Sequence, residues 1–271
     1  ARDAIRAIFL ETIVKGKGLD CIMRATGAEP VPTPFAVFEY ARAIKRHVPG
    51  WNDFILFAMV VATMAVYSAP QEEAADGIIL RGLPEPEIKR SVEGDLGMRV
   101  SAHATARVGG AALATLLAAH GIKPETLSSY ADRLAQTPDY LPANDEDHQL
   151  DTVLAGICVG HACARHAGRS SPVYTPEGEV QVQIGRNLSR IAKIIGSGGW
   201  LSRAGDFSPA EWFAAHAIDH RGRSVLVPRT FSYYRDEQYL FPLLANLARE
   251  YPQIAARAGI RLLAEQPKEK A

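Results

Sequence analysis

The chain has 271 residues, of which 47% are hydrophobic and 22% are charged, and its 30 basic and 30 acidic side chains cancel to a formal net charge of zero. This composition is typical of a globular protein with a sizeable core, and the charge balance argues against a general affinity for nucleic acid or for an anionic membrane. Cys21, Cys158 and Cys163 are an odd, sparse set that argues against a disulfide framework, so a reducing, cytoplasmic environment is expected.

Residues 1–50 are expected to form a helical N-terminal segment. Apolar side chains recur at helical spacing over residues 2–15, up to Gly16, which predicts an amphipathic helix rather than a signal peptide. Because the chain starts without Met and already inside this pattern, a fragment or a processed product is indicated. A second helix is predicted from Thr33, as its N-cap, to about Arg46.

The stretch Phe54–Ala69 has sixteen residues and no charge. It is too short to span a membrane, which needs about 20 apolar residues. Its β-branched and aromatic residues favour strand, and its length favours two strands joined near Val61–Met64, buried on both faces of a sheet. A ligand-binding hairpin whose working residues have been replaced is a further interpretation.

Beyond this stretch, strands alternate with helices, which predicts an α/β fold in layers. Short strands are expected at 77–80, 190–195 and 225–227, and a hairpin at 173–183. Helices are expected at 108–119, 124–134, 147–166, 208–218, 236–250 and 252–263, and a frayed tail at 265–271. The helix ending at His166 is expected to have Gly168 at its C′ position. Residues 81–99, polar and punctuated by Gly and Pro, are expected to form a long loop that is either functional or a solvated surface.

Two groups of residues have metal-ligand types but not the expected arrangement. Cys158, His161, Cys163 and His166 would spread over about 200° of a helix, so they cannot converge on one tetrahedral ion. His216 and His220 share a helical face, but the glutamate of a zincin motif is missing between them. No metal site is therefore predicted.

The segment Ile194-Ile-Gly-Ser-Gly-Gly199 is the more informative motif. A strand that ends in small residues before a helix places backbone N–H groups at a helix N-terminus, where a flat ring or a phosphate can approach closely. A tight turn between a strand and a helix is the structural alternative.

Four segments together carry a family resemblance: 81–99, with its run Glu93-Gly-Asp-Leu-Gly-Met-Arg99, and 165–168, 194–199 and 239–247. Over essentially the whole chain, they resemble the MutL/GlmL accessory proteins of adenosylcobalamin-dependent glutamate and ornithine mutases. The resemblance implies an α/β fold with a ribonuclease-H-like lobe of the actin/Hsp70 ATPase type. The lobe is expected over residues 51–271 as a partial domain, with a helical insertion at about 105–168.

The resemblance also assigns candidate site residues. Gly196, Ser197, Gly198 and Gly199 match the adenosine-contacting loop of that fold, and Thr63 matches the phosphate hairpin, which normally reads Asp-x-Gly-Gly-Ala-Thr-Thr-Asp. The hairpin falls on residues 58–65, where its aspartates and glycines are replaced by Ala58, Ala65, Val60 and Val61. Alanine offers no oxygen to Mg²⁺ or water, and valine keeps phosphate from the backbone. The family's first phosphate loop is absent, so ATP or ADP binding is expected to be weakened and hydrolysis lost.

Three functions are compatible with the sequence motifs and the family resemblance. The first is an ATPase-like accessory or reactivation factor that binds a cobalamin-dependent mutase subunit. The second is an active ATP-binding protein completed by an absent N-terminal half, and the third is an enzyme related to the hydantoinase/oxoprolinase group, for which His103, Asp95 and Arg99 give no evident constellation. Charge reversal at Arg90 and Arg99 is predicted to weaken partner binding without unfolding the chain.

Overall fold

The structure is a computed structural model that describes residues 19–27, 31–69, 78–108, 111–176 and 178–270. Its strands are β1 Phe54–Met59, β2 Met64–Ala69, β3 Ile78–Arg81, β4 Lys89–Glu93, β5 Arg169–Thr175, β6 Gly178–Ile184, β7 Lys193–Ser197, β8 Ser224–Val225, β9 Thr230–Arg235 and β10 Ala264–Lys270. Its helices are α2 Leu19–Thr26, α3 Thr33–His47, α4 Ala102–Arg107, α5 Ala111–Ala119, α6 Pro124–Gln136, α7 Asp145–His166, α8 Ala210–Ala214, α9 Phe241–Leu247 and α10 Pro252–Arg261.

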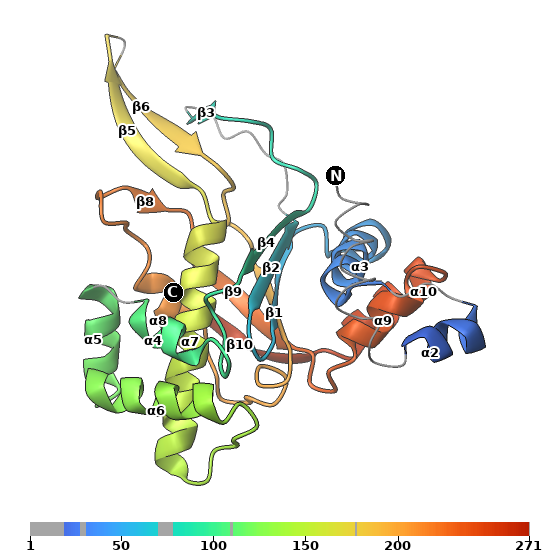
Figure 1. The fold of residues 1–271 in the computed structure, drawn as a ribbon. Coiled ribbons are helices and arrows are strands. Elements are labelled where there is room, and N and C mark those ends of the chain that lie inside the picture. Colours follow the sequence, from blue (N-terminus) through green and yellow to red (C-terminus); the bar gives the residue numbers. More distant parts are fainter. Residues whose placement is uncertain (1–18, 28–30, 70–77, 109–110, 177, 271) are drawn as a thin grey trace.

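A six-stranded mixed sheet forms the centre, in the order β10-β9-β7-β1-β2-β4. β1 pairs antiparallel with β2 and β2 with β4, whereas β1, β7 and β9 run parallel. Helices α3, α9 and α10 lie on one side of the sheet, and α7 with α4, α6 and α8 on the other (Figure 1). The fold is therefore a mixed α/β fold in three layers.

The apolar stretch lies in the middle of these layers. Ile55 and Phe57 belong to the hydrophobic cluster on the α7 side, and Phe54 and Leu56 to the cluster on the α3 side. Alternate residues of a strand face opposite sides of a sheet, so a strand covered on both faces has no position that faces solvent. The predicted pair of buried strands is thus confirmed, with the turn at residues 60–63.

A second sheet, in the order β3-β6-β5-β8, projects away from the central body (Figure 1). It follows α7 through Gly168, where an added Cβ would lie 2.5 Å from the Gly185 carbonyl carbon. Gly168 is therefore required by close backbone packing. The C-cap residue of α7 is Ala167, so Gly168 occupies the expected C′ position, although its φ is not positive.

Several element boundaries differ from the expectation. Residues 81–99 contain β4, an edge strand paired with β2, and the helix expected from residue 236 begins only at Phe241, after the strand β9. The helix expected at 208–218 is the short α8, whose N-cap residue is Pro209 rather than Ser208. The tail expected to fray is β10, paired with β9. In α3, Pro32 is the N-cap instead of Thr33.

Some expectations stay untested. The helix predicted at 2–15 lies outside the described residues, and the division at residue 50 remains a prediction. None of the helices in the described ranges combines the length and apolarity that a membrane crossing requires.

Candidate functional site

A pocket of about 300 Å³ lies at the edge of the central sheet where β1 and β7 end. Its sheet side is formed by Leu56, Ala58, Met59, Val60, Thr63, Ala65, Tyr67, Val92, Ser197 and Gly198, and its helical side by Thr33, Pro34, Val37, Tyr239, Phe241 and Pro242. Among the described residues, these sixteen line the pocket and none of them carries a charge. The pocket can therefore offer shape, apolar surface and a few hydroxyl groups, but no ionic contact.

The hairpin turn is held by the segment that follows β4. The Arg99 N–H donates to the Val61 carbonyl oxygen at 3.0 Å, and the Ser101 hydroxyl donates to the Ala62 carbonyl oxygen at 2.8 Å. A Cβ on Gly97 would lie 2.6 Å from the Ala62 carbonyl carbon, so only glycine allows this approach. The end of the 81–99 segment thus supports the turn instead of forming a free loop.

The glycine-rich end of β7 packs against the same turn. Gly198 has a φ of +113°, and an added Cβ would lie 1.9 Å from the Met59 carbonyl oxygen. A Cβ on Gly196 would lie 2.0 Å from the Tyr233 hydroxyl oxygen, whereas Gly199 has open space around it. Protein packing alone accounts for the first two glycines, which strengthens the structural alternative for this motif.

Asp236 joins β7 to the helical wall of the pocket. Its buried carboxylate accepts a hydrogen bond from the Ser197 hydroxyl at 2.8 Å and from the backbone N–H groups of Leu240 and Phe241 at 2.8 and 2.9 Å. Between these contacts, Tyr239 has a φ of 51°, which is uncommon for a residue other than glycine. The carboxylate therefore fixes the loop that positions Tyr239 and Phe241 on the pocket.

The structure brings only part of the predicted site together. Thr63, Ser197 and Gly198 line the pocket, as do Ala58, Ala65 and Val60, but Gly196, Gly199 and Val61 do not. Sequence reasoning missed the contributions of α3 and of the start of α9. Pro34 and Pro242, each near the start of a helix, marked those helix ends but not their proximity to the hairpin.

The residues of metal-ligand type on α7 have separate environments. Cys158 and Cys163 are buried free thiols, and burial raises the pKa of Cys158 to about 12. His166 lies between the hydroxyls of Ser68 and Ser91, at 2.7 and 2.8 Å, and burial lowers its pKa to about 3. Within the described ranges, no three His, Cys, Asp or Glu side chains are grouped to hold a metal ion.

Arg99 is not available for docking, contrary to the expectation for the 81–99 segment. It is 11% exposed at the side chain and pairs with both oxygens of the fully buried Asp151, at 3.0 and 2.7 Å. Tyr130 donates a further hydrogen bond to that carboxylate at 2.9 Å. Charge reversal at Arg99 would therefore disrupt the core, so the expectation that it leaves the fold intact is wrong.

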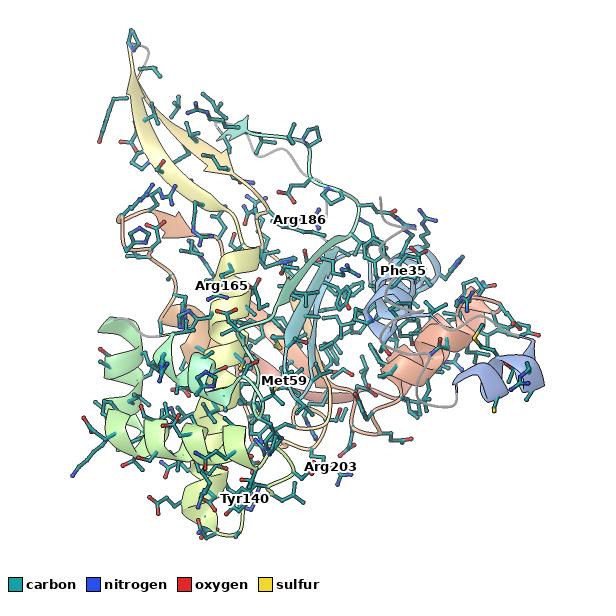
Figure 2. The ribbon with its side chains drawn as sticks, viewed as in Figure 1. Phe35, Met59, Tyr140, Arg165, Arg186 and Arg203 are labelled. Carbon is teal, nitrogen blue, oxygen red and sulfur yellow. The ribbon has the colours of Figure 1, made fainter. Side chains whose placement is uncertain are left out.

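A second polar network lies at the far end of the hairpin. Arg186 donates to the Ser68 carbonyl oxygen at 2.7 Å and to the Pro86 carbonyl oxygen. Ser68 pairs with Ile55 near the base of the hairpin, whereas the pocket extends from the Leu56–Tyr67 pair to the tip. The labels of Arg186 and Met59 mark the base and the tip (Figure 2). The network fixes the base of the hairpin and contributes nothing to the pocket wall.

Comparison with known proteins identifies the family. The family model for the MutL protein matches residues 1–262. Protein MutL of Clostridium tetanomorphum is 33% identical over 262 residues, which are 95% of this chain and 56% of the relative, so the chain spans little more than half of that protein's length. No solved structure matches the chain. The chain belongs to the MutL protein family.

Proposed function

We propose that the chain is part of an ATPase-like accessory factor that binds and reactivates a cobalamin-dependent amino-acid mutase, and that it does not itself hydrolyse ATP. Membership of the MutL family supports the accessory role, through the resemblance to proteins that serve such mutases. The mixed central sheet, with a hairpin tip and a glycine-rich strand end on one edge, is compatible with the ribonuclease-H-like lobe that the resemblance implies.

The observation that carries the lack of hydrolysis is the uncharged pocket. Phosphoryl transfer is catalysed by positioning and by charge, with carboxylates, lysine or Mg²⁺ around the phosphates. Here Ala58 and Ala65 stand at the two aspartate positions of the phosphate hairpin, and both line the pocket. Placing a phosphate beside them would desolvate its charge without compensation, which costs several kcal/mol. The residues present therefore do not fit Mg·ATP.

A second candidate is an ATP-binding protein completed by a further segment. The specific observation in its favour is that the relative has 44% of its length outside the matched part, by subtraction of the covered 56%. In this alternative, the missing segment would supply the charged groups. An enzyme of the hydantoinase/oxoprolinase group has less support, because Asp95 pairs with Arg165 at 2.7 and 2.8 Å and Arg99 with Asp151, so neither is available as a catalytic group.

The test combines nucleotide titration, phosphate release and capture of a mutase. The expected result is no saturable heat with Mg·ATP, no phosphate release above a blank, and retention of a cobalamin-dependent mutase subunit on the immobilised chain. Phosphate release by the purified chain would contradict the proposal. Adding the separately produced unmatched part of the Clostridium tetanomorphum relative distinguishes the two candidates, because only the second predicts that it starts turnover.

A matched pair of variants checks the role of the lost carboxylates. Ala58→Asp with Ala65→Asp places both carboxylates on the pocket and is expected to raise affinity for Mg·ADP at least tenfold. Val100→Asp, at an exposed valine outside the pocket, adds a carboxylate without placing it near the ligand and is expected to change nothing. Equal affinity in both variants would count against the assignment of the hairpin.

A further inference from the structure

We propose that the pocket at the hairpin tip binds a small, uncharged molecule about the size of a bicyclic ring, with one or two hydrogen-bonding groups. The proposal deepens the proposed function and rests on it, because it takes this pocket to be no longer a phosphate site. The residues that line the pocket determine this class of ligand, whichever partner the chain serves.

The size of the pocket fits such a molecule. Its volume of about 300 Å³ lies at the lower end of the range of small-molecule pockets, which is about 300 to 1,000 Å³. A pocket of this size has room for a single bicyclic ring.

The chemistry of the walls selects for an uncharged ligand. Leu56 and Met59 on β1 and Phe241 on α9 are buried apolar residues that line the pocket. Thr63 on the hairpin turn and Thr33 at the start of α3 bring hydroxyl groups from two elements, and neither hydroxyl has a hydrogen-bond partner in the described part of the chain. Such a site gains affinity from apolar burial and orientation from a hydroxyl contact, but it penalises a charged group.

The mouth of the pocket is apolar as well. Val60 is 44% exposed, Val92 46% and Tyr239 42%, and all three line the pocket. Tyr239 has the strained backbone described above, held by the contacts of Asp236 with the next two N–H groups. Strain of this kind is maintained at a cost and is concentrated at ligand-binding positions. An exposed aromatic ring, fixed at the mouth of an uncharged cavity, is suited to cover a flat ligand.

The experiment uses two fluorinated probes that differ in charge. 5-Fluoroindole is a neutral bicyclic ring with one N–H donor, and 5-fluoroindole-3-acetate adds a carboxylate. Fluorine NMR of each probe is recorded while the 271-residue chain is titrated in. The expected result is saturable broadening or shift for 5-fluoroindole, with at least tenfold weaker binding of the acetate. Absence of saturable binding, or equal affinity for both probes, would overturn the proposal.

Neighbouring valines provide the matched variants. Val60→Asp places a carboxylate on the pocket, whereas Val61→Asp places it one residue along the same turn, at 54% exposure and outside the lining. Both side chains are exposed, so both variants are expected to fold, which thermal melting checks. Affinity for 5-fluoroindole should fall at least tenfold in Val60→Asp and less than twofold in Val61→Asp. Equal loss in both variants would refute the assignment of the binding site.

Two further readouts separate this inference from the proposed function. If Mg·ATP is turned over and 5-fluoroindole does not compete with it, both proposals fail. If neither probe binds but mutase capture is lost in Val60→Asp and kept in Val61→Asp, the pocket receives a side chain of the partner. In that case the accessory role stands and the small-molecule inference is refuted.

Discussion

Replacing Gly198 by alanine tests whether the glycine-rich motif is required by packing against the hairpin. The new Cβ would lie 1.9 Å from the Met59 carbonyl oxygen and 2.8 Å from its carbonyl carbon, which are backbone atoms that cannot rotate away. Overpacking of this kind costs about 1 to 3 kcal/mol. Holding a residue with a Cβ at a φ of +113° adds about 1 to 3 kcal/mol. We therefore expect a loss of about 2 to 6 kcal/mol in the free energy of unfolding.

Urea denaturation followed by circular dichroism measures this loss. With a slope of about 3 kcal/mol per molar urea, the midpoint of Gly198→Ala should fall by about 1 to 2 M. Gly199→Ala is the matched control, because that position has nothing within 4 Å and should change stability by less than about 0.5 kcal/mol.

The comparison of these two glycines decides between two roles. If both variants unfold at the same urea concentration as the parent chain, the end of β7 does not pack on Met59 as described, and close approach of a ligand becomes the better reason for the glycines. If Gly199→Ala is the more damaging variant, the packing argument is refuted outright.

Three other perturbations test the core around the site. Arg99→Ala should cost about 3 to 5 kcal/mol, measured by urea denaturation, because it leaves the fully buried Asp151 carboxylate without its cation. Gly156→Ala should cost about 1 to 3 kcal/mol and lower the melting temperature, because its Cβ would lie 1.9 Å from the Trp212 ring. Burial holds the pKa of His166 at about 3, against about 6.5 unfolded, so only the unfolded chain takes up this proton as pH falls below 6.5. Stability should then drop by about 2 kcal/mol between pH 6.5 and 5, and His166→Gln should flatten that dependence in urea titrations at the two pH values.

The first two of these changes have a control within the chain. Arg90→Ala removes a cation of the same segment. The Arg90 guanidinium donates an exposed hydrogen bond to the Pro34 carbonyl oxygen, so the loss of stability in Arg90→Ala should stay below about 1 kcal/mol. Gly94→Ala adds a Cβ with nothing within 4 Å. A cost for Arg90→Ala equal to that of Arg99→Ala would mean that the buried ion pair does not form. An acid sensitivity retained in full by His166→Gln would assign it to other groups.

The hairpin was predictable because burial on both faces of a sheet excludes charged residues from a strand, and that exclusion is visible in the sequence. A strand covered on both faces has no solvent-facing position for a charge, and Phe54–Ala69 has no charged residue. β4 and β10 have no such signature, since both are edge strands with polar sequences. β9 has the alternation of a strand in its sequence, with aromatic Phe231 and Tyr233 buried two positions apart, so it could have been predicted.

The pocket was predictable only on its sheet side. Thr63 and Ser197 belong to motifs that are continuous in sequence, and both lie on the pocket. The opposite wall depends on where α3 and α9 pack, and α9 starts where it does because the Asp236 carboxylate binds the N–H groups of Leu240 and Phe241. A contact between a side chain and backbone groups four and five residues away leaves no period or composition to detect.

The contacts that shape the hairpin turn are separate from the residues that would give it phosphate chemistry. The turn is fixed from outside by the Arg99 N–H, by the Ser101 hydroxyl and by the close approach of Gly97 and Gly198 to its backbone. None of these contacts involves the side chains at Ala58 or at the other replaced positions. Under the proposed function, the replacement of aspartate and glycine in the hairpin leaves the turn formed and the pocket open, while it removes the charge that the pocket would need for a nucleotide. The fold and the chemistry can be changed independently at this site, so variants at the replaced positions report on ligand binding, and variants at the supporting glycines report on stability.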